Sequence, residues 1–211
     1  MADTTINRVG PTLAGDGTNP QNRLGKMAEL ITQQAHGKYF EAVSRGNCYA
    51  AMTAATGVSV ASLTISTAAP FALANPIGSG RRLALMWIEM GYVSGTFGAG
   101  NLVLALGGIS GTAVSGTAIV PVNLWTGGGV QAVGKPLTTA TLPAAPTAVR
   151  NFANLDAWVG SLTTSPFNIY LDLDSSFVLD PGSSFSVEGT TAAGTSPLVV
   201  FGCGWEEIPL I

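Results

Sequence analysis

Apolar residues recur along most of the chain in short runs that are separated by clusters of Gly, Pro, Ser and Asn. From residue 57 onward these runs are rich in β-branched and aromatic residues, which favour strands over helices. Short strands separated by such turns are typical of an antiparallel β-sandwich or barrel, so the chain is predicted to be all-β. The predicted strands lie within 57–67, 81–93, 101–108, 116–125, 148–159, 165–173, 175–180, 183–189 and 197–208.

Alternation along two of these segments predicts which side chains share a face. The segment 81–93 is mostly apolar on both faces, which predicts a strand in the middle of a sheet. The segment 57–67 is rich in β-branched residues and is predicted to be a single strand. Alternation places Leu83, Leu85, Trp87 and Glu89 opposite Ala84, Met86, Ile88 and Met90, and Val58 and Val60 opposite Leu63 and Ile65.

The clearest turn signal is the segment Asp180–Ser183, which reads Asp-Pro-Gly-Ser between two apolar runs. Pro presets φ at the second position of a turn, and Gly accepts the left-handed conformation at the third. A hairpin-like reversal is therefore predicted between 175–180 and 183–189.

The first fifty residues are less regular. Residues 1–25 combine Gly, Pro, Asn, Asp and Thr without periodicity, which predicts an extended N-terminal arm ahead of a single domain at 26–211. The segment 26–34 fits a short helix or a strand equally well. The segment 36–55 is predicted to form two short strands with a turn. An arm of this length could reach across a neighbouring subunit or hang free.

The composition limits the kinds of partner that the chain is expected to bind. Only 10% of the 211 residues are charged, against about 25% in an ordinary domain. No residue is charged in 46–80 or 90–134, but both spans are broken by Pro and rich in small residues, so a membrane-spanning helix is not expected. The net charge of −3 gives no basic field for nucleic acid. A surface with so little charge favours association with other protein surfaces.

The few charges are unevenly distributed. Residues 1–150 carry nine basic and five acidic side chains, whereas 151–211 carry seven acidic and no basic ones. The charges of the two halves would neutralise each other if strands of both halves interleave in one sandwich, which is the favoured interpretation. The alternative is a positive surface that meets a negative surface on a neighbouring subunit.

Candidate catalytic and metal-binding groups are sparse. His36 is the only histidine, it precedes a glycine in a predicted turn, and the chain has no G-x-S-x-G nucleophile elbow. Cys48 and Cys203 lie far apart without C-x-x-C spacing, which predicts free buried thiols and no zinc site. The segment Gly95–Gly100 lacks the order of a phosphate-binding loop and is predicted to be an ordinary loop.

Carboxylates are the remaining candidates. Asp172 and Asp174 would lie on one face of a strand. With Asp156, Asp180 and Glu188 nearby in the sequence, they could form a general acid–base pair or a Ca²⁺ site. The favoured interpretation is an exposed face whose charges protect the strand from pairing with other chains. The adjacent Glu206 and Glu207 would point to opposite faces and cannot converge. The tryptophans are predicted to be core or interface anchors rather than a sugar groove; they are Trp87, Trp125, Trp158 and Trp205. No catalytic residue, cofactor site or metal site is therefore predicted.

Two segments resemble stretches of small structural proteins encoded by tailed bacteriophages. They are HGKYFEAVSRGN at 36–47 and DPGSSFSVEGTTAAGTSPLVVFGCGWEEIPL at 180–210. The resemblance covers residues 26–211 and implies a jelly-roll-like β-sandwich behind a short arm. It carries turn and strand chemistry and no active-site signature.

This resemblance implies a virion component without enzymatic activity, synthesised in the bacterial cytoplasm. The expected protein is a head decoration, or cement, subunit that forms a homo-oligomer, with a trimer favoured, and binds the major capsid protein. A tail or fibre component fits the same resemblance. The competing class is a carbohydrate- or receptor-binding module that would use Trp125, Trp158, Asp172 and Asp174.

Overall fold

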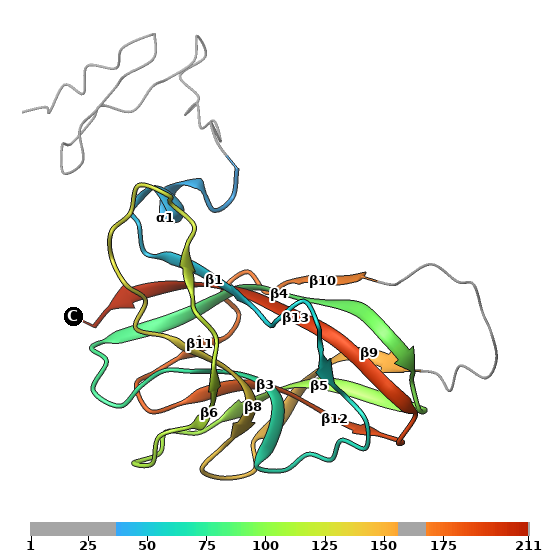
Figure 1. Cartoon of the computed structure of the whole chain (residues 1–211). Coiled ribbons are helices and arrows are strands. Elements are labelled where there is room, and N and C mark those ends of the chain that lie inside the picture. The colour runs from blue at the N-terminus through green and yellow to red at the C-terminus, as the bar shows by residue number, and fades with distance from the viewer. Residues whose placement is uncertain (1–36, 156–167, 211) are drawn as a thin grey trace, which may run out of the picture. The chain divides into compact units, whose positions relative to one another are not determined.

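The computed structural model describes residues 37–155 and 168–210 (Figure 1). The predicted arm and the segment 26–34 lie outside the described residues. The chain divides into two compact units, 1–41 and 42–211, and all of the described strands belong to the second. The elements are α1 (Phe40–Ser44), β1 (Cys48–Met52), β2 (Val58–Ser59), β3 (Ala68–Ala74), β4 (Arg81–Thr96), β5 (Gly100–Gly107), β6 (Ser115–Ala118), β7 (Val122–Asn123), β8 (Lys135–Thr141), β9 (Thr147–Leu155), β10 (Asn168–Asp172), β11 (Val178–Leu179), β12 (Ser184–Thr191) and β13 (Thr195–Pro209).

The strands form two antiparallel sheets that pack face to face. One sheet has the order β10-β4-β13-β1-β7, with β11 also paired to β4 and β2 to β13. The other has the order β6-β8-β3-β12-β5-β9. The predicted all-β antiparallel sandwich is confirmed.

The connectivity of the eight main strands is that of a jelly roll. Numbered in chain order, these strands are β1, β3, β4, β5, β9, β10, β12 and β13, and they run 1-8-3-6 in the first sheet and 2-7-4-5 in the second. Strands from the N-terminal and C-terminal halves are neighbours in both sheets, because β4 lies between β10 and β13 while β12 lies between β3 and β5. The predicted interleaving of the two halves is therefore confirmed.

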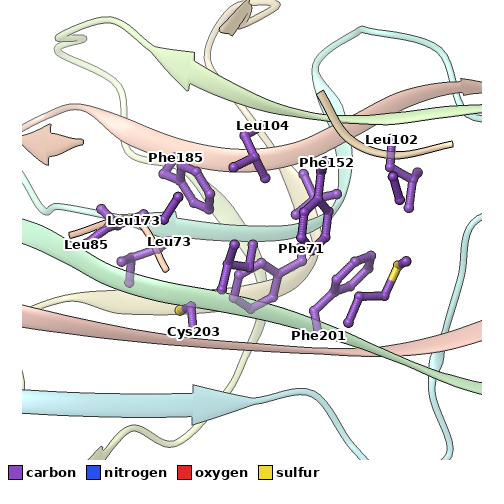
Figure 2. Close-up of a cluster of buried hydrophobic side chains, with 14 of the residues drawn as sticks. Phe71, Leu73, Leu85, Leu102, Leu104, Phe152, Leu173, Phe185, Phe201 and Cys203 are labelled. Atoms are coloured by element: carbon purple, nitrogen blue, oxygen red, sulfur yellow. The ribbon is translucent and has the colours of Figure 1, made fainter. Parts of the chain in front are cut away.

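The core lies between the two sheets, where their inward side chains meet. Figure 2 shows these side chains pointing toward one another across the gap. Large aromatic and aliphatic residues dominate, as expected for a close-packed sandwich interior. The labelled members of this cluster are Phe71, Leu73, Leu85, Leu102, Leu104, Phe152, Leu173, Phe185, Phe201 and Cys203.

β4 is a central strand as predicted, but its side chains do not alternate regularly. A β-bulge at Met86 interrupts the pairing with β13, which runs from Leu85 opposite Trp205 directly to Trp87 opposite Gly204. The Met86 carbonyl accepts hydrogen bonds from the backbone N–H groups of Leu173 (2.9 Å) and Asp174 (3.1 Å) instead.

The bulge reverses the inward and outward sides along β4. Leu83 and Leu85 before it, and Ile88 and Met90 after it, all belong to the core cluster. The predicted face that joined Leu83 and Leu85 to Trp87 and Glu89 is thus wrong.

The local predictions for 36–55 and 57–67 also need correction. The first part of 36–55 forms α1 rather than a strand, and the turn after α1 closes at Gly46, which has φ +74° and donates its N–H to the Val43 carbonyl (2.9 Å). In 57–67 only β2 is extended. Its register with β13 ends at Val58 and Ser59, and Ser62 takes a positive φ of 51° in the loop that follows.

The Asp180–Ser183 turn forms as predicted, but it does not close a hairpin. Gly182 has φ +87°, and the Ser183 N–H donates to the Asp180 carbonyl (3.1 Å). β11 before the turn pairs with β4 in the first sheet, whereas β12 after it lies in the second. The turn therefore connects the two layers of the sandwich.

Candidate functional site

An aromatic pair lies on the outer face of the first sheet, and two glycines of β13 make room for it. Phe201, Cys203 and Trp205 point into the core, so Gly202 and Gly204 between them face outward. A β-carbon added to Gly204 would lie 2.6 Å from Cε2 of Trp87. The indole of Trp87 therefore lies directly over the backbone of β13.

Tyr170 of the neighbouring strand β10 extends this aromatic surface. Its ring stacks beside that of Trp87, with 6.1 Å between the ring centroids and 30° between the planes. Tyr170 is 56% exposed, although it stands on a regular strand of the sheet. We call Trp87 and Tyr170 the aromatic platform.

Two carboxylates border the aromatic platform on the same face. A β-carbon added to Gly202 would lie 2.6 Å from Oε1 of Glu89, so this side chain extends over Gly202. Asp172 is paired in register with Trp87, and Tyr170 with Glu89. Paired residues of an antiparallel ladder point to the same side, so all four groups share the outer face.

Asp172 and Asp174 do not form the predicted strand-face pair. β10 ends at Asp172, and Asp174 lies in the following turn with φ +47°. The Asp172 carboxylate accepts the backbone N–H of Asp174 (3.1 Å), which is an Asx turn. Asp180 lies elsewhere and forms an exposed ion pair with Arg82 at 2.7 Å. His36, Asp156 and Trp158 fall outside the described residues.

Glu188, in contrast, is buried on β12. It is 1% exposed, and its Oε1 atom has no hydrogen-bond partner in the described part of the chain. Burial raises the pKa of Glu188 to about 7, while Ser186 and the backbone of Ser66 oppose this shift. It does not converge with Asp172 or Asp174, because its strand belongs to the second sheet.

Glu206 and Glu207 face opposite sides of β13, as predicted. Glu207 is fully buried, and its Oε1 accepts the backbone N–H groups of Val133 and Gly134, each at 2.8 Å. The indole N–H of Trp205 donates to the same oxygen at 3.2 Å. Glu207 therefore fixes the end of the loop between β7 and β8 and has a structural role.

The predicted free buried thiols are confirmed. Cys48 pairs in register with Glu206, and Cys203 with Ala51, so the two thiols lie on different faces of the sheet. Burial raises the pKa of Cys48 to about 12 and that of Cys203 further still.

Neither thiol should react in the folded protein. We expect no release of thionitrobenzoate when the native chain is treated with Ellman's reagent at pH 8, since both sulfurs are buried and neutral. Two equivalents are expected after unfolding in guanidinium. Rapid reaction of one thiol in the native state would contradict the burial of that residue.

The described tryptophans have separate roles. Trp205 is a core residue, as predicted, whereas Trp125 is 47% exposed on the loop after β7 and packs against Gly46. The sequence pattern singles out Trp87 but does not place it beside Tyr170. The available signal was the Gly202-Cys203-Gly204 spacing, which leaves two unoccupied positions on one face of a strand.

A second surface feature lies at the end of the sandwich that carries the Asp180–Ser183 turn. Ile109, Val149 and Val178 line one groove of about 420 Å³. Ile77 and Ile109 both lie against Gly182. All four aliphatic side chains are exposed, Ile109 by 73%. We call Ile77, Ile109, Val149 and Val178 the loop-end patch.

Within 37–155 and 168–210, no three His, Cys, Asp or Glu side chains are placed to hold a metal ion. None of the helices in the same ranges is long and apolar enough to cross a membrane. The chain matches no protein-family model, no curated protein and no solved structure.

Proposed function

We propose that this chain is a non-enzymatic structural subunit of a tailed-bacteriophage virion, specifically a capsid decoration protein. In this proposal it forms a homo-oligomer, with a trimer favoured, and binds the major capsid protein. The jelly roll supports the proposal because viral shells use this architecture, although lectin domains use it as well. The resemblance of 36–47 and 180–210 to phage structural proteins points in the same direction.

The observation that carries the association is the loop-end patch. Large exposed aliphatic clusters are uncommon on monomers and mark surfaces that other proteins cover. Polar groups border it, because Asp180 lines the same groove and pairs with Arg82. An apolar centre with a polar rim is the usual anatomy of a protein interface. We assign this patch to contacts between copies of the chain.

Replacing Ile109 by aspartate is expected to dissociate the oligomer. A carboxylate placed in an apolar interface costs about 3 kcal/mol, which weakens association by about 100-fold. Light scattering coupled to gel filtration should show three chains for the wild type and one for Ile109→Asp, with an unchanged circular dichroism spectrum. Val120→Asp is the matched control, since Val120 is equally apolar and exposed but lies outside the patch. If Val120→Asp dissociates the oligomer and Ile109→Asp does not, the interface lies at the connection between β6 and β7 instead.

The virion location is tested separately, on purified particles. Immunogold labelling with antibodies against the chain should place gold over the heads. Gold over the tail or fibres would replace the decoration role by the tail or fibre alternative. Absence of the chain from particles would refute the virion proposal.

A further inference from the structure

We propose that the aromatic platform binds the pyranose ring of a neutral glycan. The proposal goes beyond the structural role, since the platform shares no residue with the loop-end patch. It also differs from the glycan site considered from the sequence, because Trp125 lies on a separate loop and Asp174 in a turn.

The shape of the platform is the first argument. The indole of Trp87 is held close against β13, because Gly204 leaves the space for it, and any larger residue there would displace it. The ring of Tyr170, on the next strand, stacks with the indole at 30° between the planes. Two adjoining rings offer an apolar surface against which the C–H face of a sugar ring packs.

The polar groups beside the platform supply the second argument. Glu89 extends over Gly202 next to the rings, and Asp172 lies opposite Trp87 in register. Carboxylates accept hydrogen bonds only, which suits the hydroxyl groups at the edge of a sugar. A few placed polar groups beside an apolar surface are the usual composition of a small-ligand site.

The charge of the site selects among sugars. Glu89 and Asp172 are both acidic, and the described basic side chains of this sheet, Arg81 and Arg82, lie at the far end of β4. Anionic sugars such as uronic acids would meet like charge here. The platform therefore favours uncharged sugars.

The test is a binding titration of the full chain with defined oligosaccharides. Neutral probes are maltohexaose, cellohexaose and hexa-N-acetylchitohexaose, and the anionic probe is hexagalacturonate. We expect at least one neutral probe to change the tryptophan fluorescence on binding and hexagalacturonate to bind at least tenfold more weakly. Trp87→Ala and Tyr170→Ala should each weaken binding of the neutral probe, measured by calorimetry, by tenfold or more.

Trp125→Ala is the matched control, since Trp125 is an exposed tryptophan away from the platform. Its affinity should stay within twofold of the wild type. Glu89→Gln should narrow the difference between neutral and anionic probes. The proposal is overturned if no neutral probe binds, if the anionic probe binds as tightly, or if only Trp125→Ala loses binding. These outcomes are independent of the virion proposal, because the titration uses the isolated chain.

Discussion

Replacing Trp205 by alanine is expected to lower the free energy of unfolding by about 3–5 kcal/mol. Trp205 is completely buried on β13, and its ring stacks on Tyr49 with 6.0 Å between the centroids. Its removal leaves a large cavity, and the surrounding strands can close it only in part because both sheets are fixed by long ladders. It also removes the indole N–H that donates to the buried Glu207 carboxylate.

Urea unfolding followed by circular dichroism measures this loss. Trp125→Ala is the control for removal of an indole and should lower the free energy of unfolding by much less than Trp205→Ala, because about half of this side chain is exposed. Trp205→Phe should be intermediate, since it keeps an aromatic ring against Tyr49 but loses the hydrogen bond. A loss below about 1 kcal/mol for Trp205→Ala would contradict the packing of this end of the core.

Much of the sandwich is specified by local signals in the sequence. The apolar runs that predict β4, β5, β12 and β13 are continuous or alternate strictly, and each is a strand in the structure. Asp180–Ser183 carries its turn chemistry in four adjacent residues, so the turn could be predicted. The connection between the two layers could not be predicted, because local sequence patterns do not show that β11 and β12 pair with different sheets.

The errors arise where distant residues decide the local conformation. The bulge at Met86 exists because the turn at Leu173 and Asp174 hydrogen-bonds to its carbonyl from more than eighty residues away. β8 was not predicted, because KPLTTAT is short and weakly apolar and becomes a strand by pairing with β3 and β6. The helix α1 is a single turn stopped by Gly46, too short to show periodicity.

The candidate site was only partly predictable for the same reason. Trp87, Tyr170 and Gly204 come from three strands that meet only in the folded sheet. Glu188 illustrates the opposite case. Alternation with Phe185 and Val187 places it on the outer face, where exposure is expected. In the structure, the loop at 60–66 packs against the end of β12, with hydrogen bonds between Leu63 and Thr191. The carboxyl of Glu188 is therefore buried.

This buried carboxyl predicts a protein that loses stability as the pH rises through neutrality. The pKa of Glu188 is about 7 in the folded chain, against about 4.3 for an unfolded glutamate. Between these values the folded state holds the proton more tightly, so the stabilisation by the neutral carboxyl is complete below pH 4 and is lost as the pH passes 7. The loss contributed by this residue is about 3–4 kcal/mol between pH 4 and pH 8.

Glu188→Gln should remove this contribution, because the amide keeps the shape of the carboxyl and does not ionise. We expect the variant to be more stable than the wild type by about 3–4 kcal/mol at pH 8 and nearly equal to it at pH 4.5. Urea unfolding at several pH values between 4.5 and 8 measures the difference. Glu206→Gln, the same substitution on the outer face of β13, is the matched control. If the curves of Glu188→Gln and the wild type run parallel over this range, Glu188 is ionised in the folded chain and the loop at 60–66 does not shield it from water.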